Sequence, residues 1–292
     1  MVMKSKTIYT NFAMLTAAIV WGSTFIVIKK SLIGMHAVTL VCYRFALASL
    51  FMGVILIFLR KKPWKNLKEG LILGLLLFIS YVTQSLALYY MMVVDAGFIS
   101  GLFVIFVPIF SFACGREKLR WNFIVATILA AIGLWSVTGG IESFKWGDSL
   151  MLVSALFFAL HILYADFVVK KCDIWVLNFQ QFLVVALASF FGILLFELPW
   201  TISSWNIAWG ILYLSLFANV LGYAVQLGAQ KTISPTMCAL ILSLEPVFAA
   251  IFAWTIGGEE IIMADIVGGV MIIAAIICAQ IYRRDKASQI MI

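Results

Sequence analysis

Charged residues are scarce in this chain of 292 residues: only 11% are Asp, Glu, Lys or Arg, whereas 64% are hydrophobic. A soluble globular domain has about 25% charged and about 45–50% apolar residues. No soluble core of this chain length can hold so much apolar surface. The composition therefore excludes soluble multi-domain and disordered proteins, and it favours lipid as the surroundings of the chain.

Motifs for several kinds of chemistry are also missing. The chain has no GxxxxGK[ST] phosphate loop, which argues against ATP as its energy source. It has no HExxH motif, no Cys/His cluster and no GxSxG motif of serine hydrolases. The five cysteines match no CxxC or zinc spacing, and we expect them to pack as small apolar residues. We therefore predict no cofactor, no metal site and no catalytic residue.

Long apolar runs dominate what is present. A helix needs about 20 apolar residues, each rising about 1.5 Å, to cross the hydrocarbon core of a membrane. The chain contains ten such runs, which predict an all-α integral membrane protein with ten transmembrane helices. The predicted spans are 12–33, 37–59, 70–90, 95–114, 121–138, 148–169, 174–197, 205–229, 234–257 and 262–282.

Positive charge is distributed unevenly over the short loops between these runs. With the N-terminus inside, sixteen of the 20 Lys and Arg residues lie on the inner side. Only Lys29, Lys30 and Lys145 lie on the outer side, and Arg44 lies within a span. This bias is typical of cytoplasmic loops, so the net charge of +7 does not indicate nucleic-acid binding. It predicts a multi-pass protein of the plasma (inner) membrane with both termini cytoplasmic.

The chain also contains an internal repeat, visible when residues 87–110 are laid over residues 225–248. The matching pairs are Ala96 with Ser234, Leu102 with Leu240, Pro108 with Pro246, Phe110 with Phe248 and, after a four-residue insertion, Glu117 with Glu259. We predict two five-helix repeats, over 8–140 and 146–284. Because five is an odd number, the second repeat is inverted relative to the first. Inverted repeats around a midplane site are typical of secondary transporters.

Several short motifs carry a resemblance to a known family. The motif residues are Ala18-Ile19-Val20-Trp21-Gly22-Ser23-Thr24-Phe25, Arg44-Phe45, Ala96-Gly97, Pro108, Ser243-Leu244-Glu245-Pro246-Val247 and Gly257-Gly258-Glu259. Through these motifs the chain resembles the EamA-type members of the drug/metabolite transporter (DMT) superfamily over essentially its whole length. The resemblance implies a ten-helix inverted-repeat carrier, commonly an exporter of amino acids or other small metabolites.

Two charged residues lie deep inside predicted spans, where an ionisable group costs about 2.5–3.5 kcal/mol on insertion scales. Arg44 is about seven residues from the outer end of its span, too deep to reach the headgroups easily. It is either an anchor for a solute carboxylate or a structural ion-pair or hydrogen-bond donor. Glu245 lies at mid-span directly before Pro246 and is a candidate for proton coupling. The depths of both residues also permit an Arg44–Glu245 pair.

Polar uncharged and aromatic residues gather near the same depth. His161 is a candidate proton relay, although a lone histidine in an apolar helix is more often a packing residue. Trp21, Tyr81, Gln84 and Asn219 are expected to shape the pocket, although such residues also hydrogen-bond between helices without further function.

Other polar positions have simpler explanations. We expect Asp166 to pair with Lys170 at i,i+4 spacing. Spans 121–138 and 262–282 are nearly free of polar groups at their middle and are expected at the periphery, facing lipid or forming a homodimer.

The leading interpretation is a secondary transporter that moves a small metabolite across the plasma membrane by alternating access. An amino acid or related compound is the first expectation, with export favoured and uptake as the alternative. A membrane-embedded enzyme acting on a lipid-linked substrate would need a nucleophile–base pair or metal ligands, and the buried Arg44 and Glu245 argue against an inert scaffold. The expected partners are a small-molecule substrate, the lipid bilayer and, through Glu245, protons.

Overall fold

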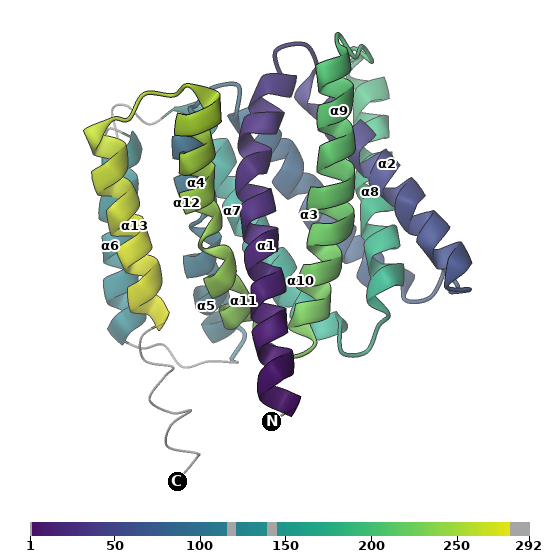
Figure 1. The fold of residues 1–292 in the computed structure, drawn as a ribbon, viewed down its shortest axis with the longest axis horizontal. Coiled ribbons are helices and arrows are strands. Elements are labelled where there is room, and N and C mark those ends of the chain that lie inside the picture. Colours follow the sequence, from purple (N-terminus) through teal and green to yellow (C-terminus); the bar gives the residue numbers. More distant parts are fainter. Residues whose placement is uncertain (1, 116–120, 139–144, 281–292) are drawn as a thin grey trace.

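The computed structural model describes residues 2–115, 121–138 and 145–280, and this part of the chain is helical throughout, with no strand (Figure 1). The helices are α1 (Val2–Ser31), α2 (Ala37–Phe58), α3 (Leu67–Ala87), α4 (Val93–Ser100), α5 (Phe103–Ala113), α6 (Trp121–Thr138), α7 (Trp146–Val168), α8 (Ile174–Leu195), α9 (Trp205–Tyr213), α10 (Gly222–Gln230), α11 (Pro235–Leu242), α12 (Glu245–Phe252) and α13 (Met263–Gln280). Two π-helical segments, Leu214–Leu221 and Ala253–Gly257, follow α9 and α12.

Length and apolar composition make these helices membrane spans. Within the described residues, seven helical stretches are long and apolar enough to cross a membrane. Shorter apolar stretches cover Ile124–Gly133, Glu245–Gly257 and Met263–Ala275. The chain is therefore a multi-pass membrane protein. The start of α1 and the end of α13 lie at the same end of the bundle (Figure 1).

Two apolar segments of the bundle are broken near their middle. The first is interrupted between α4 and α5, at Gly101 and Leu102, and the second between α11 and α12, at Ser243 and Leu244. Pro246 lies in the first turn of α12, where its missing N–H leaves no helical hydrogen bond unmade. The break next to Pro246 places Glu245 at a helix start.

Glycine allows the neighbouring helices to approach α12 closely. A Cβ atom added at Gly22 of α1 would lie 2.6 Å from the Cβ of Phe248, and one at Gly97 of α4 would lie 2.7 Å from the Cβ of Ala249. Only a residue without a side chain permits such separations. Because α12 packs against α1 and α4 at these points, Glu245 lies at the centre of the bundle rather than at its edge.

The helices α6 and α13 pack together at one edge of the bundle (Figure 1). Much of their apolar surface is exposed, including Ile128 and Trp135 of α6 and Val267 and Val270 of α13. This position agrees with the prediction that these two segments are peripheral. The exposed side chains form a surface suited to lipid.

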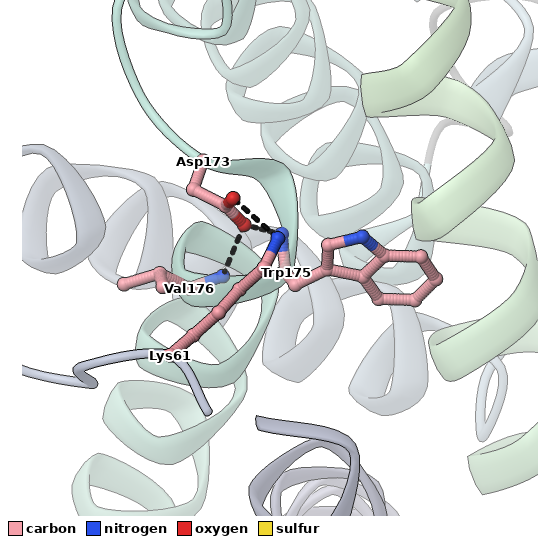
Figure 2. Close-up of polar contacts among 4 residues, drawn as sticks. All are labelled: Lys61, Asp173, Trp175 and Val176. Atoms are coloured by element: carbon pink, nitrogen blue, oxygen red, sulfur yellow. Dashed lines mark hydrogen bonds and ion pairs between the residues drawn. The ribbon is translucent and has the colours of Figure 1, made fainter. Parts of the chain in front are cut away.

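At the predicted cytoplasmic end, Asp173 caps the start of α8 and forms an ion pair with Lys61, in the loop that follows α2 (Figure 2). Its Oδ1 accepts the backbone N–H of Trp175 at 2.9 Å, and its Oδ2 lies 2.5 Å from Nζ of Lys61. Burial by itself raises the pKa of Asp173, but the hydrogen bonds from Lys61 and Trp175 outweigh it and hold the pKa below its ordinary value. The charged carboxylate is therefore the form that stabilises the fold.

We expect Asp173→Ala to lower stability by about 1 kcal/mol, because the first N–H groups of α8 lose their cap. Asp173→Asn keeps the cap but removes the charge, so it isolates the contribution of the ion pair with Lys61 to stability. This contribution is small, because both side chains are partly exposed. Because the pKa of Asp173 is lowered, the difference in stability between the unmodified protein and Asp173→Asn is present at neutral pH and is lost as the pH falls below about 4. Thermal unfolding of both variants between pH 8 and pH 3 checks this; a difference that grows on acidification would contradict it.

Candidate functional site

An internal cavity lies at mid-depth in the bundle, where α1, α3, α4, α5, α7 and α10 to α12 converge. Its lining residues are Trp21, Thr24, Tyr81, Gln84, Ser100, Phe103, Phe158, His161, Ile162, Tyr223, Gln226, Leu242 and Glu245. The cavity volume is about 30 Å³, which is room for one or two water molecules. The cavity is therefore too small for a metabolite in this structure, and a solute must widen it to bind.

The carboxyl group of Glu245 lines this cavity. Its side chain is 8% exposed, and no residue in the described part of the chain donates a hydrogen bond or forms an ion pair with it. The Arg44–Glu245 pair that their depths permit is absent from the described residues, and the guanidinium of Arg44 donates to Asn219 instead. The carboxylate of Glu245 therefore faces the cavity without a neutralising cation.

Arg44 is held outside the cavity wall. Its side chain is 1% exposed, and its Nη2 donates a hydrogen bond of 2.6 Å to Oδ1 of Asn219. The guanidinium carbon lies 4.6 Å from the ring centroid of Tyr81 and 5.3 Å from that of Phe45, distances typical of cation–π interactions. Its Nε and Nη1 have no hydrogen-bond acceptor within the described residues. Of the two roles predicted for Arg44, this geometry favours the structural one in the closed state.

The π-helical segment Leu214–Leu221 makes the contact with Arg44 possible. A π-helical turn displaces side chains relative to an α-helix, and such turns are frequent at functional sites. In this segment Asn219 points its amide to α2, and the carbonyl of Ala218 accepts a 2.8 Å hydrogen bond from Nε1 of Trp21. Trp21 therefore anchors α1 to the irregular segment while its ring lines the cavity.

Two tyrosines connect the region of Arg44 with that of Glu245. The hydroxyl groups of Tyr81 and Tyr223 are 2.9 Å apart, and both side chains interact electrostatically with Arg44 and with Glu245. The ring of Tyr223 also lies 5.2 Å from that of Trp21. The two tyrosines therefore form a link between the guanidinium of Arg44 and the carboxyl group of Glu245.

His161 has a defined tautomer. Its Nε2 lies 3.0 Å from Oε1 of Gln181, which can only accept, so Nε2 carries the proton. The Nε2 of Gln181 in turn donates to Oδ1 of Asn178 at 2.6 Å. The second ring nitrogen of a neutral His161 is then an acceptor. This arrangement is compatible with both predicted roles, proton relay and hydrogen-bonded packing residue.

The structure brings together most of the predicted site. Five of the seven residues line the cavity: Trp21, Tyr81, Gln84, His161 and Glu245. Arg44 and Asn219 pair behind it. Asp166 lies away from the cavity, with its Oδ1 3.6 Å from Nζ of Lys170, as predicted.

Sequence reasoning missed several lining residues. Tyr223 lies four residues after Asn219, so helical spacing could have found it. Ser100, Thr24 and Phe158 carry no such signal, because small polar residues and phenylalanines occur throughout the apolar runs.

We expect Asn219→Leu to destabilise the protein by about 1.5–3 kcal/mol, because it leaves a buried guanidinium without its acceptor. The double variant Arg44→Met with Asn219→Leu should recover part of this loss, since both partners are then apolar. Melting temperatures of the single and double variants in one detergent measure the coupling. Ser215→Ala, in the same π-helical segment, is the matched control. A double variant less stable than Asn219→Leu would contradict the assignment.

Comparisons with known proteins agree with this architecture. The model of the EamA-like transporter family matches residues 8–139 and 145–280. An "Uncharacterized transporter" of Archaeoglobus fulgidus is 29% identical over 276 residues, covering 93% of this chain and 86% of the relative. The "Uncharacterized inner membrane transporter YedA" of Escherichia coli K12 is 22% identical, covering 85% of this chain and 83% of that protein.

A solved structure described as "Crystal structure of protein" has the same fold. It aligns with a TM-score of 0.71 at 16% identity, over 95% of this chain and 98% of the other. At this identity the likeness concerns the fold alone.

Proposed function

This chain belongs to the EamA-like transporter family, and we propose that it moves a small metabolite across the plasma membrane by alternating access around the central cavity. The observation that carries the proposal is the unpaired Glu245 in a small cavity at mid-depth, next to broken helices. Transporter sites lie near the bilayer midplane and are commonly formed by discontinuous helices. That the relatives above are named transporters supports the same reading.

We propose ten crossings in two inverted repeats, 8–140 and 146–284, with both termini cytoplasmic. The two segments matched by the family model support the division. The two broken segments, α4–α5 and α11–α12, support it as well, since they occupy corresponding places in the two halves. The count of loop charges supports the orientation.

Several contacts join the helices at the proposed outer end. The two carboxylate oxygens of Glu259 accept the N–H groups of Val93 and Val94, at 2.7 and 3.1 Å, at the N-terminus of α4. Nζ of Lys29 donates to the carbonyls of Leu88 and Met91 at 2.6 and 2.9 Å. Opening toward the outside would have to release such bonds, so they act as an outer gate. The cavity then communicates with one side of the membrane at a time.

In the proposed mechanism Glu245 binds the solute or a proton. Its carboxylate is free to accept either, because Arg44 is committed to Asn219. His161 and the hydroxyls of Tyr81 and Tyr223 shape the surrounding pocket. Export of an amino acid or related compound is the favoured direction, following the common activity of the resembling family, and uptake is the alternative.

We expect Glu245→Gln to reduce solute flux at least tenfold and to abolish its response to a pH gradient, because the amide can neither release a proton nor carry charge. The solute is first found by a thermal-shift screen of amino acids, amines and nucleosides, since a specific ligand stabilises the native state. Flux is then measured in proteoliposomes with and without a pH gradient. Glu197→Gln, at an exposed carboxylate, is the matched control. Unchanged flux and pH response in Glu245→Gln would exclude the coupling role.

A further inference from the structure

We propose that the cavity recognises a primary ammonium group, so that the transported solute is an amine with an apolar tail. This inference rests on the proposed transport function and adds the substrate class. Three kinds of side chain on the cavity wall support the inference: a carboxylate without a partner, buried acceptors without a donor, and aromatic rings.

The cavity wall carries an acidic group and, among the described residues, no strongly basic one. Glu245 is the acidic residue among the lining residues, and no lysine or arginine of the described chain lines the cavity. Arg44 cannot supply the missing charge in this state, because Asn219 and the Tyr81 ring hold it outside the wall. An anionic solute would therefore face repulsion, whereas a cation would gain its counterion.

Two further acceptors on the wall lack a donor. Oε1 of Gln226 and Oγ of Ser100 belong to side chains about 1% exposed, and neither has a hydrogen-bond partner in the described residues. A buried polar atom without a partner is costly, so a ligand that supplies N–H groups gains free energy at both places. A primary ammonium carries three donors and no acceptor. Its donors complement the set Glu245, Gln226 and Ser100.

Aromatic rings form much of the remaining wall. Trp21, Tyr81 and Tyr223 lie on one side of the cavity, with ring centroids 5.2 and 6.4 Å apart in the Trp21–Tyr223 and Tyr81–Tyr223 pairs. Phe103 and Phe158 also line it. Aromatic faces attract cations, and the attraction is strongest where water is excluded. The same rings offer an apolar surface for the carbon skeleton of an amine.

These features favour a simple amine over the amino-acid substrate expected from the sequence. A zwitterionic amino acid carries a carboxylate as well as an ammonium group, and the wall offers no fixed cation for the carboxylate. Burying that carboxylate without a counter-cation is unfavourable. A simple amine avoids this cost, so the site favours it over the amino acid with the same side chain.

The test compares four ligands that share a phenylethyl skeleton: phenethylamine, its N,N,N-trimethyl derivative, phenylalanine and 3-phenylpropionate. Binding to the purified full-length protein is measured by calorimetry. We expect phenethylamine to bind at least tenfold more tightly than phenylalanine, and phenylpropionate to bind least, since it lacks the cation.

Variants separate the contribution of the acceptors from that of the charge. Gln226→Met and Ser100→Ala should each weaken phenethylamine binding about tenfold, because a hydrogen bond to a charged group is lost. They should leave the trimethyl derivative unaffected, because it has no N–H donor. Glu245→Gln should weaken both cations. Ser154→Ala is the matched control, since Ser154 is also buried with an unpartnered Oγ but does not line the cavity.

The possible outcomes are distinct. Binding of phenylalanine or phenylpropionate at least as tight as that of phenethylamine overturns the inference, and so does an equal effect of Gln226→Met on both cations. Counterflow of a neutral or anionic solute in proteoliposomes, without amine binding, overturns the inference but leaves the transport function intact. If folded protein shows no saturable flux of any solute class, the transport function fails as well.

Discussion

The hydrogen bond between Arg44 and Asn219 is the interaction on which the centre of this bundle depends. A guanidinium at this depth has no access to water and must find its partners within the protein. Asn219 provides the acceptor, and the faces of Tyr81 and Phe45 surround the rest of the charge. Because Asn219 lies on a π-helical turn, the irregular backbone of Leu214–Leu221 is part of the same arrangement.

The Arg44–Asn219 bond also determines what Glu245 can do. If Arg44 reached Glu245, the two charges would neutralise each other and the cavity would present no net charge. Instead, Tyr81 and Tyr223 interact with both groups, and their hydroxyls are hydrogen-bonded to each other at 2.9 Å. The carboxylate stays open to a proton or a cationic solute, and the arginine serves the packing of α2 against the π-helical turn.

The sequence predicts the helices more fully than it predicts the site. Apolar runs report where a chain can cross hydrocarbon, and ranges such as 37–59 and 174–197 agree closely with α2 and α8. Residue depth along a helix also follows from counting, which is why Trp21, Gln84 and Glu245 converge as predicted. The direction in which a side chain points is different, since it depends on how the helices pack. For this reason the depths of Arg44 and Glu245 suggested a pair that the structure does not contain, and Tyr223 was missed.

The irregular elements were the hardest to foresee, and they matter most for the cavity. Pro246 indicated a break, but the π-helical turns have no comparable marker in the sequence. Their effect is local: one turn brings Asn219 to Arg44 and presents the carbonyl of Ala218 to Trp21. The guanidinium of Arg44 is bound by Asn219 of this turn, while the carboxyl group of Glu245 faces the cavity without a basic partner among the described residues. The irregular turn therefore takes part in keeping the two buried groups apart.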